Sequence, residues 1–370
     1  MMRRLWFGLL CVVLIFGLSG CGSSVPVDER ALVLILGFAP GQGNTIRMLF
    51  QIPTSTELTS VTSGTNSSGK QFYTVEATGA TPGRAFAKAQ TMVGQDLYLG
   101  QVQLIAFSSK LSAAQMAQVQ DWLNRLGTMD NSAYVAATSS VDRLFERQPA
   151  AQIPPAVYIY DTFSCPRCSA VDFQQRQWTL ETQLANDLAP DHSMWMPWIE
   201  ANQSGFRIAN VVVYRHFQPA IVLTRAQTVD LGYLMGRTKK GDLMITWRNH
   251  TIGIRSIVAS SHYRIRWQSG RMHIFLTMHF VGTLEEAVDM QLHADTVKSV
   301  EHLAAQKLGA QVLSTLVLLQ QHGTNPVDYG ERYAWWHPET VSRQVMRQAY
   351  AHADITVSTR VQITNTGAVT

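Results

Sequence analysis

The chain has one long apolar run, and it lies near the N-terminus. Arg3 and Arg4 precede the apolar segment Leu5–Leu18, and the small residues Ser19 and Gly20 follow it. This order is typical of an export signal that is later removed. The run is too short for a spanning helix, which needs about 20 apolar residues. No later segment has ~18 uninterrupted apolar residues. Because of the export signal, we expect the rest of the chain to fold outside the cytoplasm.

The residues Leu18-Ser19-Gly20-Cys21 match a bacterial lipobox in all four positions. The motif predicts that residues 1–20 are removed and that Cys21 becomes the mature N-terminus with a thioether-linked diacylglycerol. Two acyl chains are enough for stable anchoring to a membrane. The alternative is an ordinary secretory signal that happens to end in Cys, because short motifs also occur by chance.

Composition limits the architecture and the partners. About 350 residues remain after the signal, which is more than one hydrophobic core normally serves. Apolar residues make up 46% and charged residues 15%, as expected of a folded chain. Removing two arginines lowers the net charge from +4 to +2, which is too small to indicate nucleic-acid binding.

Hydrophobic periodicity predicts alternating strands and helices in the first half. Thr81 and Pro82 open one helix, Ser112 caps a second, and the polar segment Ser60–Lys70 is expected to be an exposed loop. No βαβ series is evident. The predicted strands are Ala31–Phe38, Thr45–Ile52, Gln71–Thr78, Val102–Phe107 and Tyr134–Thr138.

The second half shows local hairpins and one long helix. That helix is expected from Leu284 to Gly323 with a break near Asp295, so that Glu285 and Glu286 meet its dipole favourably. The other predicted elements are the hairpin Phe206–Tyr214 with Ala220–Leu223, the helical turn Asp230–Met235, the strand Asp242–Trp247, the hairpin His262–Trp267 with Met272–Val281 around Ser269-Gly270, and the alternating strand Ile355–Ile363.

These patterns predict a multi-domain α+β fold with antiparallel or mixed sheets, packed helices and a long helix in the C-terminal domain. The expected division is a signal peptide over 1–20, an α+β domain over 21–195, a small middle domain over 196–256 and a second α+β domain over 257–370.

Cys165 and Cys168 form a Cys-Pro-Arg-Cys motif. It is the one stretch of the chain whose side chains suggest a chemical reaction, the interconversion of two thiols and a disulfide. A structural disulfide is the favoured interpretation in an oxidising exterior. The alternative is a redox pair in a thioredoxin-like unit, with Ala156–Tyr160 as its strand and Asp172–Gln183 as its helix. A zinc site is disfavoured, because only two thiols and His192 lie close together.

No other cluster indicates catalysis, and we expect neither a metal site nor a cofactor. His293 and His302 lack metal-binding spacing, and Gly41-Gln42-Gly43 lacks the strand–helix context of a dinucleotide loop. Trp335-Trp336-His337 is either an exposed aromatic anchor for a partner or part of the core, and we favour the core because large aromatic side chains usually supply buried area.

Five stretches of the chain follow the order of one known family: Asp28–Gly37, Leu99–Ile105, Met196–Ile199 with Ile208–Tyr214, Thr228–Gly236 and Pro338–Gly367. Together with the lipobox and the length, they resemble the Ger(x)C family of spore germination lipoproteins, the C subunits of nutrient germinant receptors. The chain departs from the family at Gly37-Phe38-Ala39, where Gly-Ile-Asp is usual, and at Met346, where an aromatic residue is usual.

The resemblance implies a three-domain α+β ectodomain, lipid-anchored at the outer face of the inner spore membrane. It would act with two polytopic subunits, of A and B type, in a complex that responds to a small nutrient. The family has no established catalytic residues, so only Cys21 carries over. The rival functions are a membrane-tethered thiol–disulfide oxidoreductase using Cys165 and Cys168, and a substrate-binding lipoprotein, whose doubly wound lobes the hairpin-rich pattern disfavours.

Overall fold

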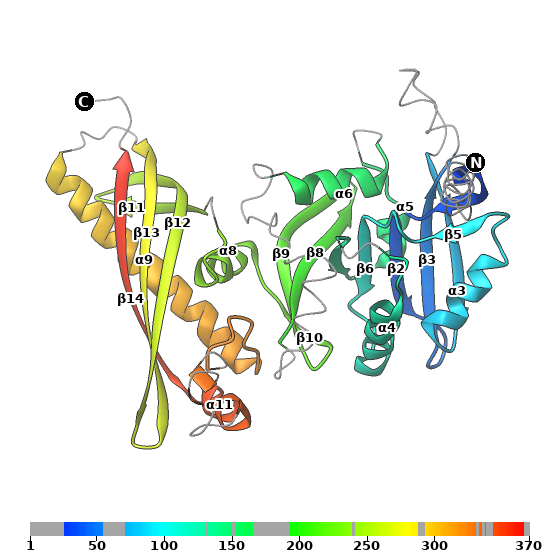
Figure 1. The fold of residues 1–370 in the computed structure, drawn as a ribbon. Coiled ribbons are helices and arrows are strands. Elements are labelled where there is room, and N and C mark those ends of the chain that lie inside the picture. The colour runs from blue at the N-terminus through cyan, green and yellow to red at the C-terminus, as the bar shows by residue number, and fades with distance from the viewer. Residues whose placement is uncertain are drawn as a thin grey trace, which may run out of the picture.

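The computed structural model describes residues 26–54, 71–129, 132–149, 153–165, 193–203, 205–238, 241–287, 293–330, 333–334, 337 and 343–365. These residues form an eight-stranded sheet, a four-stranded sheet and a two-stranded ladder. Figure 1 shows the two larger sheets side by side, with helices packed against each. The predicted multi-sheet α+β class, including a long C-terminal helix, is confirmed.

The eight-stranded sheet has the order β10-β9-β8-β7-β6-β2-β3-β4. Its strands are β2 (Ile35–Pro40), β3 (Ile46–Pro53), β4 (Phe72–Gly79), β6 (Leu104–Ser108), β7 (Tyr134–Thr138), β8 (Trp195–Asn202), β9 (Gly205–Arg215) and β10 (Gln218–Val222). The helices of this half are the 3-10 helix η1 (Val27–Glu29), α3 (Pro82–Gln90), α4 (Ala113–Arg125), α5 (Val141–Glu146) and α6 (Pro155–Ser164). The short strands β1 (Arg30–Leu32) and β5 (Asp96–Tyr98) pair in parallel beside it.

Several of these elements begin where the sequence predicted them. Thr81 caps α3 with Pro82 in its first turn, and Ser112 forms a capping box with Gln115 at the start of α4. The strand Tyr134–Thr138 has the predicted bounds. The predicted strand Ala31–Phe38 is instead divided between β1 and β2.

The expectation of no βαβ series was wrong. β2, β6, β7 and β8 form successive parallel pairs, and helices lie in the connections between them. The central strands β2, β6 and β7 are buried along almost their whole length, so they lack the polar–apolar alternation that marks a half-exposed strand. Parallel neighbours need crossover connections, and here α3 lies between β2 and β6, α4 between β6 and β7, and α5 and α6 between β7 and β8.

Those two helical layers are defined by neighbouring residues of β2. Phe38 makes an edge contact with Trp122 of α4, with 6.2 Å between ring centroids. Gly37 faces the opposite side, where a Cβ atom would lie 2.7 Å from Phe145 and Val141 of α5. Because successive residues of a strand point to opposite faces, α4 and α5 cover different faces of the sheet.

The four-stranded sheet of the C-terminal half has the order β11-β12-β13-β14. Its strands are β11 (Gly241–Trp247), β12 (His250–Gln268), β13 (Arg271–Ala287) and β14 (Asp354–Asn365), and its helices are α8 (Arg225–Leu234), α9 (Ala294–Gln321) and α11 (Arg343–Tyr350). β12 and β13 form the predicted hairpin around Ser269 and Gly270, both with positive φ as a type I′ turn requires. The hairpin extends well beyond the predicted ends of its strands.

The expected helix start at Leu284 was also wrong. β13 continues to Ala287 and α9 begins at Ala294, since the register with β12 extends the sheet through this segment. Glu285 therefore meets a cross-strand partner instead of a helix dipole, and its carboxylate lies 2.6 Å from Arg255. Residues 288–292, which carry part of the predicted pattern, lie outside the described residues.

α8 lies between the two large sheets (Figure 1) and is tied to both halves of the chain. The Thr228 hydroxyl accepts a hydrogen bond from the backbone N–H of Val211 in β9 at 3.1 Å, and the Thr315 hydroxyl of α9 donates to Asp230 at 2.8 Å. β8, β9 and β10 continue the first sheet across the expected boundary at 195/196, although a single registered pair, Ala137 with Trp198, joins β8 to β7. The division into three domains stays a prediction.

Candidate functional site

Several residues singled out from the sequence lie outside the described residues. These are the acylation candidate Cys21, the whole of the predicted loop Ser60–Lys70, Cys168, His192, the expected helix Asp172–Gln183, and Trp335 with Trp336. In the part of the chain that the structure describes, none of the helices combines the length and apolar composition needed to cross a bilayer.

Cys165 directly follows α6 and is disulfide-bonded. The segment Ala156–Tyr160, considered as the strand of a thioredoxin-like unit, is helical, which corrects that interpretation. Pro155 starts the helix, and the buried residues Ile159 and Phe163 recur at helical spacing. Cys165 therefore does not stand in the strand–motif–helix arrangement of a thioredoxin-like redox site.

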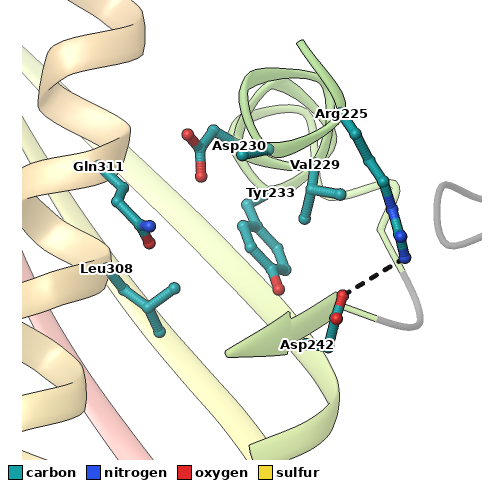
Figure 2. A pocket seen from close by; sticks show the side chains of 8 residues that line it. Arg225, Val229, Asp230, Tyr233, Asp242, Leu308 and Gln311 are labelled. Carbon is teal, nitrogen blue, oxygen red and sulfur yellow. Dashed lines mark ion pairs between the residues drawn. The ribbon is translucent and has the colours of Figure 1, made fainter. Parts of the chain in front are cut away.

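A cavity of about 300 Å³ lies where α8, β11 and α9 meet. Figure 2 shows Asp230 and Tyr233 projecting from α8 between α9 and β11. The cavity is lined by Arg225, Ala226, Val229, Asp230, Tyr233, Asp242, Leu308 and Gln311. It combines ionisable, polar and apolar groups from segments far apart in the sequence.

The helix that carries most of these side chains begins earlier than expected. The sequence predicted a helical turn over Asp230–Met235, whereas α8 starts at Arg225. Its N-terminus is a capping box: the Thr224 hydroxyl accepts from the Gln227 N–H, and the Gln227 side chain accepts from the Thr224 N–H. The Thr-x-x-Gln spacing is a helix start signal that the sequence itself carries, and it marks the longer helix.

Asp230 is a buried carboxylate with a nearby donor. Its residue is 5% exposed, and Thr315 Oγ1 donates to Asp230 Oδ2 at 2.8 Å. Burial raises the pKa of Asp230 to about 6, and the hydrogen bond from Thr315 opposes that rise. Desolvation dominates because removing a charge from water costs more than one neutral hydrogen bond returns.

Tyr233 presents a buried hydroxyl to the same region. Its residue is 1% exposed, and no described residue forms a hydrogen bond with the hydroxyl. Burial first, then the carboxylates of Asp230 and Asp242, raise the pKa of Tyr233. The ring packs edge-on against Phe280 of β13 at 5.2 Å, and the hydroxyl occupies the space that a side chain at Gly241 would fill.

Arg225 and Asp242 form the charged rim of the cavity. Their closest side-chain atoms are 3.8 Å apart, and each side chain is 54% exposed. Such an exposed pair contributes little stability. At the rim of the cavity, the positive charge of Arg225 is therefore partly neutralised by Asp242. Asp230 is more deeply buried and lies beside α9.

The cavity brings two carboxylates, a guanidinium and a tyrosine side chain together. The lining residues include no Ser, Cys or His that could act as a nucleophile or base with the carboxylates. Among the described residues, no group of three or more His, Cys, Asp or Glu side chains could hold a metal ion. No sequence signal marks Asp230 or Tyr233 as a site residue, since a single buried acid has no local motif and the partner of Asp230, Thr315, lies 85 residues away.

Both halves of the chain match models of known protein families. Residues 23–187 match the spore germination protein N-terminal domain, and residues 215–367 match the spore germination B3/GerAC-like C-terminal domain. The chain belongs to the GerAC-like spore germination family. The resemblance seen in the sequence is therefore confirmed, and the stretch between the two matches, residues 188–214, contains β8 and all of β9 except Arg215.

A solved structure described as the GerBC protein shares the fold of this family member. The two chains align over 89% of this chain and 97% of the other, with a TM-score of 0.58 and 14% sequence identity. At that identity the likeness concerns the fold alone. No curated protein sequence matches the chain.

Proposed function

We propose that this GerAC-like protein is the lipid-anchored C-type subunit of a spore nutrient germinant receptor. It would dock on two polytopic membrane subunits, of A and B type, and act in assembly or signalling and not as an enzyme. The observation that carries the proposal is the pair of family matches over residues 23–187 and 215–367. The GerBC-like fold is consistent with it.

The anchor is proposed from the lipobox. Cys21 would carry the diacylglycerol, and the first described element, η1, begins at Val27. The intervening residues can extend only about 20 Å even when fully stretched. The first domain would therefore stay close to the extracytoplasmic face of the membrane, where polytopic partners expose their loops.

The acylation of Cys21 can be tested by labelling with palmitate. We expect the parent chain to incorporate the label and sediment with membranes, and Cys21→Ala to lose the label. Cys11→Ala is the matched control, because it removes a cysteine of the signal segment without touching the lipobox. Equal labelling of parent and Cys21→Ala would contradict the anchor.

The receptor role can be tested in spores that lack the chain. Restoring the parent should restore germination on a nutrient mixture and restore the levels of the two polytopic subunits. A normal nutrient response with normal subunit levels in the deletion strain would contradict a subunit role. Because this readout does not depend on labelling, it separates the anchor from the receptor function.

A further inference from the structure

We propose that the exposed face of the four-stranded sheet docks an acidic segment of another protein, whose carboxylates are bound by Arg264, Arg266 and Arg360. This basic face is the side of β12, β13 and β14 that α9 does not cover. The inference goes beyond the proposed function. One step of it, the choice of a protein over a lipid surface, rests on the proposed anchor at Cys21.

The direction of the side chains defines the basic face. The Thr359 hydroxyl of β14 donates to the Ala305 carbonyl of α9, so the odd-numbered residues of β14 face the helix and the even-numbered ones face away. The register of the sheet continues the second set across β13 and β12. The face therefore consists of the even-numbered residues of 258–268 and 354–362 and the odd-numbered residues of 271–281. All of them are half-buried or exposed.

The basic face has an excess of positive charge. Its charged side chains are those of Arg264, Arg266, Arg271 and Arg360 against the single carboxylate of Asp354. Four positive charges and one negative charge give +3, counting the three histidines of the face as neutral. The excess is also visible along the chain, because the stretch between Asp242 and Glu285 contains five arginines and no acidic residue.

Most of these arginines have no counter-ion. The Asp354 carboxylate lies 3.7 Å from Arg271, at one end of the face. Among the described residues, Arg264, Arg266 and Arg360 form no ion pair. Like charges on one face of a sheet repel each other and raise the positive potential of the surface. An anionic partner would therefore be attracted to this face.

The kind of cation and its spacing limit the partner. Each cation is an arginine, whose planar guanidinium binds a carboxylate through two parallel hydrogen bonds. Arg264 and Arg266 are two positions apart on one strand, which is about 6.8 Å. An extended peptide repeats its side chains on one face with the same spacing. The hydroxyls of Thr277 and Ser358, which pair across β13 and β14, offer further hydrogen-bond donors.

The size of the basic face predicts a modest affinity. Three strands about 4.8 Å apart and ten residue steps of about 3.4 Å give an area of roughly 500 Å². This is below the ~800 Å² per partner of a standard stable interface. We therefore expect reversible binding that depends strongly on salt.

The position of the face favours a protein over the membrane as partner. Figure 1 shows the four-stranded sheet and β5, the partner of β1, at opposite ends of the molecule. The anchor at Cys21 would keep the β1 end within about 20 Å of the bilayer. The basic face thus belongs to the half further from the anchor, where a neighbouring protein reaches it more easily than lipid does.

The inference can be tested by fluorescence anisotropy with a labelled peptide of six Glu-Ser repeats and the full chain in detergent. The alternating sequence places its carboxylates on one side when the peptide is extended. We expect saturable binding at about 50 mM salt that weakens at least tenfold at about 500 mM salt. A matched peptide of Gln-Ser repeats should bind at least tenfold more weakly. Failure of the parent to bind the acidic peptide, or equal binding of the neutral one, would overturn the proposal.

A triple variant assigns the binding to this face. Replacing Arg264, Arg266 and Arg360 together by Gln removes three exposed charges that form no described ion pair, so the fold should persist. Affinity for the acidic peptide should fall at least tenfold. Thermal unfolding verifies that the variant is folded. An affinity equal to that of the parent would show that the peptide binds elsewhere.

The matched control removes the same charge from another part of the surface. Arg84→Gln, Lys88→Gln and Arg143→Gln, combined in one chain, change exposed positions on α3 and α5. This variant should bind the acidic peptide within about twofold of the parent. If it loses as much affinity as the triple variant of the basic face, net charge alone governs the binding and the assignment is wrong.

Co-flotation with phosphatidylglycerol vesicles tests a lipid partner. The Cys21→Ala chain should float to the same extent with and without the three substitutions of the basic face. A loss of flotation in the substituted chain would show that this face binds lipid, which overturns the choice of a protein. Peptide binding in detergent needs neither acylation nor a nutrient response, so its outcome is independent of the tests of the anchor and of the receptor function.

Discussion

At the scale of single residues, the burial of Asp230 has a consequence for stability. Its pKa is raised from 3.8 to about 6 by burial. Between those values the unfolded chain has released the proton that the folded chain still holds, so stability falls as pH rises through this window. The difference corresponds to a cost of about 3 kcal/mol at neutral pH.

We therefore predict that Asp230→Asn flattens the pH dependence of unfolding between about pH 4 and 6 and raises stability at pH 7 relative to the parent. Urea unfolding followed across that range measures the effect. Thr315→Ser, which keeps the donor hydroxyl, is the control and should preserve the slope of the parent. An unchanged slope in Asp230→Asn would mean that another group titrates.

At the scale of elements, Gly309 sets how closely α9 approaches β14. A Cβ atom at Gly309 would lie 2.9 Å from the hydroxyl oxygen of Thr359, which itself donates to the Ala305 carbonyl of α9 at 2.7 Å. The helix and strand are therefore held in direct contact at this point. A large side chain there must separate them or displace Thr359.

We predict that Gly309→Leu destabilises the protein, because overpacking a close contact costs about 1–3 kcal/mol and the Thr359 hydrogen bond is lost as well. The gain in helix propensity, about 1 kcal/mol, is smaller. Ala310→Leu is the matched control, since Ala310 is exposed on the same helix. Chemical unfolding should show a lower midpoint for Gly309→Leu than for Ala310→Leu. Equal midpoints would show that α9 and β14 can move apart at this contact without a loss of stability.

At the scale of the whole molecule, the two sheets are joined through buried polar contacts. The Val211 N–H of β9 donates to Thr228 of α8, and the Asn325 N–H after α9 donates to the Ser193 hydroxyl before β8 at 3.0 Å. The first contact ties a strand of the first sheet to α8, and the second ties the segment before β8 to the segment after α9. α8 therefore acts as the element that couples both halves.

We predict that Thr228→Val weakens this coupling, because it leaves the buried Val211 N–H unsatisfied at a cost of about 1–3 kcal/mol. Amide exchange in β9 should accelerate, and the unfolding midpoint should fall. Thr228→Ser retains the hydroxyl and should change both far less. If the two variants exchange alike, the hydrogen bond is not what holds α8 to β9.

Local sequence signals determined much of this protein. Ser112 starts α4, Tyr134–Thr138 forms β7 with the predicted bounds, and the Ser269-Gly270 turn forms the β12–β13 hairpin. Each depends on neighbouring residues: a cap, an apolar run or a turn with positive φ. The family resemblance was also readable from the sequence, because it rests on the order of such segments.

Only the tertiary structure decided the rest. The parallel pairing of β6 with β7 and the strand conformation of Leu284–Ala287 depend on hydrogen bonds to distant partners, which no local pattern encodes. The cavity arises in the same way: Asp230 gains its burial from α9, whose Thr315 is 85 residues away. Burial and pairing are properties of packed surfaces, so they exist only once distant segments meet.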